Sequence, residues 1–304
     1  MSNSVPQCPL CQGPGAGVTF PFGTVWDGRR FDYVRCRRCG SSFIDPLPDA
    51  ADLKRMYSQD AYHDSFYEIV SEEGAETRLK DALPALPPGG RLLDFGCGNG
   101  SFLIAARRAG FICDGVELDE GARARAAVNS GCDVYALEEL AAKGARYDII
   151  HLSDVIEHLP DPAATMHRLE GLLADGGLFF VEGPLEDNPS VVFYASKLVG
   201  GSKKLLGRNL YAGMPPFHLI RTHAQAQRRF FEDRLGYRVR QFTVYETGFP
   251  YLEDSSRLLD LRSTSRFLRS SIGRLGMGAA KFLSGKPFLV GNRFFAVVSP
   301  TASR

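Results

Sequence analysis

An aspartate followed by three closely spaced glycines is the part of this sequence best suited to chemistry. A short apolar run leads into Asp94, and Gly96, Gly98 and Gly100 come soon after it. Glycine has no Cβ, so it lets a chain turn sharply and approach a ligand closely. The next run, Phe102–Ala109, has the pattern of a helix, whose free N–H groups would point at the same spot. The spacing predicts a strand, a glycine-rich loop and a helix that bind a nucleotide-like cofactor.

Spacing and charge together favour one class of cofactor. Dinucleotide sites place Gly-x-Gly-x-x-Gly directly after the strand, whereas here Gly96-x-Gly98-x-Gly100 follows an acid. Asp94 would repel a pyrophosphate and attract a positively charged ligand such as S-adenosylmethionine, which carries an ammonium and a sulfonium. About one helix and one strand later stands Glu117, whose carboxylate can accept hydrogen bonds from both hydroxyls of a ribose. An unliganded glycine turn is the alternative.

Four segments, in this order, resemble the motifs of class I S-adenosylmethionine-dependent methyltransferases. Leu92–Gly100 resembles their first motif, and Gly115–Asp119 resembles their acidic second-strand motif. Tyr147–Leu159 resembles the fourth strand with its turn, and Leu172–Val181 resembles the fifth strand. The resemblance implies an α/β fold with a seven-stranded, Rossmann-like sheet. It weakens after the fifth strand, where Glu182 begins a Glu-Gly-Pro run in place of the Pro-Asn of many relatives.

These motifs and the resemblance together assign residues to the cofactor. The expected cofactor-binding residues are Tyr62, Asp94, Gly96, Gly98, Glu117 and Ser153. By analogy with the family, Ser153 lies below the methionine part, and Tyr62 closes over the cofactor carboxylate. A core or surface tyrosine is the alternative interpretation of Tyr62.

Two histidines are candidates for the general base that a hydroxyl or carbon-acid acceptor would need. His158 follows the fourth strand at its carboxyl end, where open α/β sheets bind their ligands, and imidazole titrates near neutrality. A cap on the next helix or a contact with the cofactor is the alternative. His218 precedes a helix predicted from Thr222 to Gly236, in a loop that relatives fold over the substrate. A loop histidine without a function is the alternative there.

Two Cys-x-x-Cys pairs near the N-terminus predict a metal site. The four cysteines are Cys8, Cys11, Cys36 and Cys39. Four thiolates at this spacing suit a tetrahedral Zn²⁺, and a hairpin of Val18–Phe22 with Arg30–Val34 would bring the pairs together. All four metal positions would be filled, so we expect a structural zinc and not a catalytic one. Disulfides or free thiols are the alternatives.

The cysteine pairs and the methyltransferase-like motifs divide the chain into three parts. We expect a zinc ribbon over 1–45, a linker and helical cover over the cofactor site at 46–87, and the methyltransferase domain over 88–304. Insertions at about 186–218 and 248–290 are basic and carry apolar residues among their charges. We expect these insertions to form a lid that favours an acidic or phosphate-bearing acceptor, lipid- or nucleotide-linked. A helix with a solvated basic face is the alternative.

The composition, and the combination of a zinc ribbon with a methyltransferase domain, define the expected function. The ribbon segment Cys36–Pro48, followed by Tyr57 and Tyr62, resembles bacterial methyltransferases of sugar, polysaccharide and secondary-metabolite pathways. We expect methyl transfer to an O or N atom, less readily a C atom, of a small molecule. An RNA methyltransferase and a cofactor-binding protein without catalysis are the alternatives, and a net charge of +1 argues against nucleic acid. The sequence has neither a signal-peptide pattern nor a membrane-spanning run, so we expect a cytoplasmic protein, with peripheral membrane contact left open.

Overall fold

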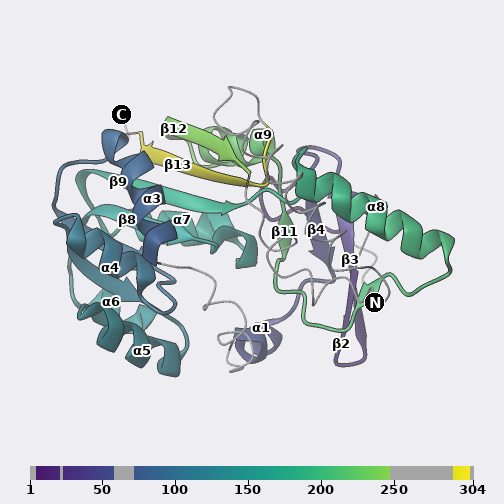
Figure 1. Ribbon diagram of the computed structural model, residues 1–304, viewed down its shortest axis with the longest axis horizontal. Helices are drawn as coiled ribbons and strands as arrows, with labels where there is room; N and C mark the ends of the chain where they lie inside the picture. The colour runs from purple at the N-terminus through teal and green to yellow at the C-terminus, as the bar shows by residue number, and fades with distance from the viewer. Residues whose placement is uncertain (1–4, 21–22, 58–71, 247–289, 302–304) are drawn as a thin grey trace, which may run out of the picture.

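The structure is a computed structural model that describes residues 5–20, 23–57, 72–246 and 290–301 of the chain. It contains two β-sheets side by side: a larger one flanked by helices, and a smaller one near the N-terminus (Figure 1). None of the described helices is both long and apolar enough to cross a membrane.

The larger sheet has seven strands in the order β12-β13-β9-β8-β5-β6-β7. Their bounds are β5 (Arg91–Phe95), β6 (Ile112–Val116), β7 (Asp133–Tyr135), β8 (Tyr147–Ser153), β9 (Leu173–Pro184), β12 (Tyr237–Tyr245) and β13 (Arg293–Pro300). Strands β5 to β9 pair in parallel, and β13 is antiparallel to both β9 and β12. This topology confirms the predicted Rossmann-like α/β fold.

Helices cover both faces of this sheet. On β5, Leu92 belongs to a buried cluster with α3 and α4, whereas Leu93 belongs to a cluster with α7 and η4. Successive strand residues point to opposite faces, so the two clusters lie on opposite sides of the sheet. The helices are α1 (Ala50–Tyr57), α3 (Glu72–Ala82), η2 (Leu83–Ala85), α4 (Ser101–Arg108), α5 (Glu120–Ser130), α6 (Leu137–Ala142), η3 (Ile156–His158), α7 (Pro162–Glu170), α8 (Val191–Leu205), α9 (Ala224–Arg229) and η4 (Phe230–Arg234).

The smaller sheet combines N-terminal strands with two short strands from much later in the chain. Its order is β10-β2-β3-β4-β11, and β1 pairs with the last residues of β3, 34–36. The strands are β1 (Gly15–Val18), β2 (Gly23–Trp26), β3 (Arg29–Cys36), β4 (Ser42–Asp45), β10 (Tyr211–Ala212) and β11 (Ile220–Arg221).

The hairpin in this sheet differs from the predicted one. It joins β2 to β3 through Asp27 and Gly28, whose φ angles of 52° and 69° suit a two-residue hairpin loop. The predicted hairpin of Val18–Phe22 with Arg30–Val34 is confirmed only at its start, where Val18 pairs with Val34 and Thr19 N donates a hydrogen bond to Tyr33 O. Arg30 and Phe31 pair with β2 instead. The physical reason is the Asp-Gly pair, which forms the tight turn between the neighbouring segments.

The expected insertion at 186–218 packs on the N-terminal residues. β10 is parallel to β2, and β11, which follows the insertion, is antiparallel to β4. In the chain, α8 lies between β9 and β10. It extends past the smaller sheet (Figure 1), and Lys197 Nζ donates a hydrogen bond to Phe20 O. The N-terminal residues and this segment therefore form one structural unit. The second expected insertion, 248–290, lies outside the described residues except at its end.

The helix predicted to begin near Thr222, with Thr222 as its N-cap, has its N-cap one residue later, at His223. His223 caps α9, because its Nδ1 accepts a hydrogen bond from Ala226 N, and its Nε2 donates to Cys39 O at 2.9 Å. The helix continues as the π-turn η4, and Gly236 follows with a φ of 69°, close to the predicted end.

Candidate active site

The glycine-rich loop after β5 has the geometry that a cofactor site requires. Gly96, Gly98 and Gly100 have φ angles of 81°, 54° and 85°, in the left-handed region that other residues avoid. A Cβ on Gly96 would stand 2.8 Å from Val155 Cγ2, so the loop has no space for a side chain there. Helix α4 begins at Ser101, directly after the loop. The loop therefore offers a ligand a cradle of backbone atoms.

Glu117, directly after β6, is bound to the same loop. Its Oε2 accepts a hydrogen bond from Gly98 N at 3.0 Å, and its Oε1 accepts from Leu118 N and Asp119 N at 2.7 and 3.2 Å. A carboxylate oxygen has two lone pairs, so Oε2 keeps one for a ligand hydroxyl. The residues present thus fit a nucleoside, with the acid held beside the glycine cradle.

Asp94 pairs with a histidine to which the sequence assigned no role. His151 is its register partner on β8, with Nδ1 2.7 Å from Asp94 Oδ1 and Nε2 3.0 Å from Glu182 Oε1. On α3, Arg78 Nε lies 2.7 Å from Glu182 Oε2. A buried row of ionisable groups therefore runs across β5, β8 and β9 beside the cradle.

The remaining predicted cofactor residues are Ser153 and Tyr62. Ser153 ends β8, is partly buried and pairs in register with Glu182. Asp94, Glu117 and Ser153 all lie at or just beyond the carboxyl ends of parallel strands, where open α/β sheets bind ligands. Tyr62 lies outside the described residues. The cofactor roles of these residues stay predictions.

The structure brings the two predicted catalytic histidines together. The rings of His158 and His218 are 4.9 Å apart and nearly perpendicular. His158 Nδ1 donates a hydrogen bond to Phe217 O at 2.7 Å, so in the neutral ring Nε2 is the nitrogen without a proton. That Nε2 lies 3.8 Å from Glu157 Oε1. The predicted alternative that His158 caps the next helix is wrong, because Asp161 caps α7.

The two histidines carry different charges because their neighbours differ. Burial and the nearby His218 lower the pKa of His158 to about 3, so this ring is neutral. Burial opposes a charge on His218 too, but Glu186 Oε2, 3.0 Å from its Nδ1, outweighs burial and raises the pKa of His218 to about 9. Burial and Asp154 raise the pKa of Glu157 to about 8. Pairs with such separated pKa values are typical of acid–base sites.

Sequence reasoning missed the partners of these histidines. Glu157 had a local signal, since it stands next to His158 at the end of a strand. Glu186 and Tyr57, which contact His218 and His158, come from distant segments and carried no such signal.

The chain matches the sequence pattern of the methyltransferase domain over residues 66–241, more than half of its length. It belongs to this family. Together with the strand order and the glycine cradle, the match identifies these residues as a class I S-adenosylmethionine-dependent methyltransferase domain.

Curated relatives of this methyltransferase include ubiquinone biosynthesis O-methyltransferases. The one from Bordetella avium is 34% identical over 115 residues, 35% of this chain and 47% of the relative. The one from Cereibacter sphaeroides is 35% identical over 143 residues, 44% of this chain and 56% of the relative. The chain spans about half the length of the curated relatives it matches. A solved S-adenosylmethionine-dependent methyltransferase from Archaeoglobus fulgidus is 19% identical, with a TM-score of 0.46 over 78% of this chain and 97% of that one.

Two side-chain clusters in the described part of the methyltransferase can hold a metal ion. One is the predicted set of Cys8, Cys11, Cys36 and Cys39, and the other is Glu157, His158 and His218; within each, the ligand atoms lie within 4.8 Å of one another. In the first, Cys8 Sγ lies 3.8 Å from Cys39 Sγ, and Cys11 Sγ lies 3.4 Å from Cys36 Sγ. A disulfide needs about 2.05 Å. The four cysteines are therefore not joined by disulfides, and neither are the three in the α/β core.

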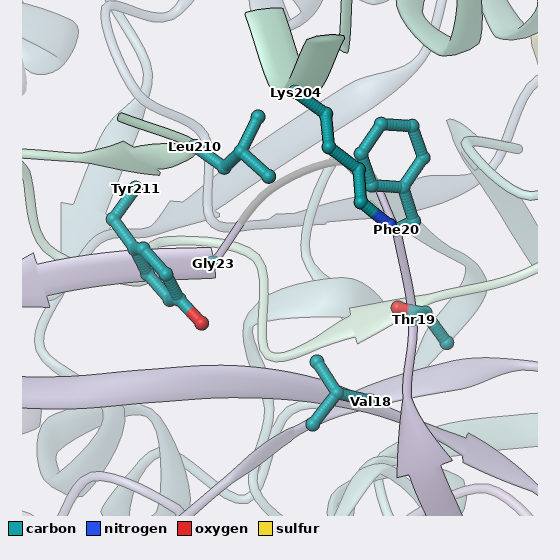
Figure 2. Close-up of a pocket in the computed structure, with 7 residues that line it drawn as sticks. All are labelled: Val18, Thr19, Phe20, Gly23, Lys204, Leu210 and Tyr211. Carbon is teal, nitrogen blue, oxygen red and sulfur yellow. The ribbon is translucent and has the colours of Figure 1, made fainter. Parts of the chain in front are cut away.

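The N-terminal unit also carries a hollow of its own. Figure 2 shows it between the first strands and the segment after α8, lined by Val18, Thr19, Phe20, Gly23, Lys204, Leu210 and Tyr211. None of the predicted cofactor, catalytic or metal residues lines it.

Proposed function

We propose that this methyltransferase transfers the methyl group of S-adenosylmethionine to an oxygen atom of a small molecule bound beside His158 and His218. The observation that carries the proposal is the convergence of Glu157 with these two histidines directly after β8. Val155, which faces Gly96 of the cofactor cradle, precedes Glu157 by two positions, so donor and acceptor sites adjoin. The O-methyltransferase names of the curated relatives favour oxygen as the acceptor atom.

The chain's own residues have separate tasks in this proposal. The bound cofactor supplies a methyl group that is already activated. The glycine loop and Glu117 hold the nucleoside, and Asp94 faces the ammonium. The neutral His158 accepts the proton of the acceptor hydroxyl at Nε2. Glu157 Oε1 lies 3.8 Å from that nitrogen and balances the charge that forms where its own carboxyl group is ionised, above about pH 8. The cationic His218 favours an acidic or phosphate-bearing acceptor.

Transfer assays with three proteins test this proposal. Wild-type protein should bind S-adenosylmethionine in calorimetry and transfer its tritiated methyl group to hydroxylated small molecules of a cell extract. We expect His158→Ala to slow transfer roughly 10²–10⁴-fold with unchanged cofactor affinity, because only the proton acceptor is lost. We expect His218→Ala mainly to raise the acceptor KM.

Three results would contradict the proposal. Methylation of nitrogen or carbon would exclude an oxygen acceptor. Methyl transfer by the His158→Ala variant at the wild-type rate would exclude His158 as the base. Turnover that needs an added divalent cation, lost in Glu157→Gln, would assign the three groups to a metal ion instead.

We also infer that the four N-terminal cysteines bind one structural Zn²⁺. Tetrahedral zinc with bonds of about 2.3 Å separates its sulfurs by about 3.8 Å, and two of the sulfur pairs are 3.8 and 3.4 Å apart. Arg38 N lies 3.4 Å from Cys36 Sγ, a backbone contact that favours the thiolate. The chemistry and the spacing of these four sulfurs therefore support a tetrahedral zinc site.

The division into a ribbon at 1–45, a cover at 46–87 and a methyltransferase domain at 88–304 also stays a proposal. Support for the cover comes from α1, whose Tyr57 hydroxyl donates a hydrogen bond to Phe217 O and lies 3.1 Å from His158 Nδ1. The lid proposed for 186–218 is supported by Glu186, which contacts His218. We propose that α8, in the same segment, gives a cytoplasmic enzyme its contact with anionic lipid.

A further inference from the structure

A buried row of charges lies beside the cofactor cradle and is not needed for the proposed transfer chemistry. Asp94 on β5, His151 on β8 and Glu182 on β9 are 2%, 0% and 1% exposed. Asp94 and His151 are register partners, and His151 bonds to both carboxylates, so the three side chains lie on one face of the sheet. On that face, α4 lays the ring of Phe102 on the imidazole of His151, with 3.5 Å between centroids. Water therefore does not solvate this histidine.

The hydrogen bonds of His151 define its charge. A carboxylate oxygen lies 2.7 Å from Nδ1 and another lies 3.0 Å from Nε2. Ionised carboxylates only accept hydrogen bonds, and a neutral imidazole has a single N–H, so between two ionised carboxylates both bonds form only when both nitrogens are protonated. Burial opposes this charge, but Asp94 and Glu182 outweigh it and raise the pKa of His151 above its usual value. With Arg78 at Glu182, two cations then balance two carboxylates.

We propose that His151 is a positioning residue that keeps the buried Asp94 ionised, so that Asp94 can attract the ammonium of S-adenosylmethionine. A carboxylate that is buried without a cationic partner takes up a proton. The imidazolium prevents this because its Nδ1 pairs with Asp94 Oδ1. Its Nε2 contacts Glu182, which in turn pairs with Arg78. This inference rests on the proposed cofactor role of Asp94.

The charge states of the groups around Asp94 and His151 affect how the pH dependence of cofactor binding is interpreted. The other titratable side chains that interact with this row are Cys97, Cys113, Glu117, Arg78, Arg293 and Tyr245. Burial raises the pKa of the two thiols and of the Tyr245 hydroxyl, so all three stay neutral near pH 7. Burial opposes the charge of Glu182, but His151 and Arg78 outweigh it and lower the pKa of Glu182. The two arginines are always charged.

The test is cofactor affinity against pH in wild-type protein and in His151→Leu. Wild-type affinity for S-adenosylmethionine should change little between pH 6 and 8. In His151→Leu, the buried Asp94 loses its cationic partner, which favours the protonated carboxyl group. We therefore expect affinity about tenfold lower at pH 7, with recovery as the pH is raised. A purely structural role would weaken binding equally at every pH.

Two controls complete the test. The double variant His151→Leu/Asp94→Asn should bind weakly without the recovery, because it cannot ionise at position 94. Recovery there would assign the pH dependence to another group and overturn the inference. Imidazole ¹⁵N spectra of wild-type protein, which do not depend on a variant folding, should show both nitrogens of His151 protonated at pH 7. A neutral ring would overturn it, as would a pH-independent loss in His151→Leu. Wild-type protein that binds no S-adenosylmethionine would instead overturn the proposed function itself.

Discussion

At the scale of single residues, Gly96 shows how a backbone position controls the cofactor site. Gly96 has a φ of 81° and would bring a Cβ to 2.8 Å from Val155 Cγ2, whereas Gly110 has a φ of 93° with nothing within 4 Å of its Cβ. We expect alanine at either position to cost about 1–2 kcal/mol of unfolding free energy through left-handed strain. Gly96→Ala should also displace the loop and lower the affinity for S-adenosylmethionine about tenfold, the effect of about 1.4 kcal/mol.

Thermal unfolding and calorimetry of the two variants check this prediction, with Gly110→Ala as the matched control for strain. Equal cofactor affinities in the two variants would mean that the contact with Val155 has no effect on the site.

Local motifs and long-range contacts explain which residues sequence reasoning found. Asp94, the glycines and Glu117 stand in one short chemical pattern, so their types and spacing were readable before any fold was known. His151 is separated from Asp94 by 57 residues, and the parallel register of β5 and β8 creates their contact. The register between two strands cannot be inferred from the sequence of either strand alone, which is why no role was predicted for His151.

At the scale of elements, α8 presents an apolar stripe to solvent. Tyr194, Leu198 and Leu205 are 63%, 74% and 90% exposed, and they follow one another at four- and seven-residue steps on one side of the helix. Lys203 and Lys204 lie in the last turn. A helix with exposed apolar side chains and nearby lysines suits the surface of an anionic membrane.

We therefore expect the protein to sediment with phosphatidylglycerol-containing vesicles and not with pure phosphatidylcholine. The double variant Leu198→Ser/Leu205→Ser should lose this binding. Val128→Ser removes an apolar side chain that is 83% exposed on another helix, α5, and should keep it. Equal sedimentation of both variants would assign the binding to another surface.

Periodicity predicted the elements of the α/β sheet better than those of the N-terminal unit. The strands and helices of the larger sheet are long enough to show alternation or helical spacing. The strands β10 and β11 have two residues each, which is too short for any pattern, and their partners come from β2 and β4. The union of the ribbon with the segment at 186–218 was for this reason absent from the sequence prediction.

At the scale of the whole molecule, the N-terminal unit supports the acceptor site. The Tyr33 hydroxyl on β3 donates a hydrogen bond to His218 O at 2.6 Å, and Ile44 N on β4 donates to Leu219 O at 2.9 Å. Leu219 N in turn donates to Glu157 O at 2.8 Å. The loop that carries His218 is thus held between the smaller sheet and η3. The cofactor cradle, in contrast, is built on β5 and β6 of the larger sheet.

Loss of zinc is therefore expected to weaken the acceptor site more than the cofactor site. Chelation, or the substitution Cys39→Ser, should loosen β3 and β4 and with them the loop of His218, because in the proposed zinc site the four thiolates would tie these strands to Cys8 and Cys11. We expect the acceptor KM to rise about tenfold, the effect of about 1.4 kcal/mol, with the S-adenosylmethionine Kd unchanged. Elemental analysis should find one zinc per wild-type chain, and Cys132→Ser, a core cysteine outside the cluster, should keep both the metal and the KM. A parallel loss of cofactor and acceptor binding would contradict the separation of the two sites, since it would mean that the ribbon stabilises the larger sheet as well.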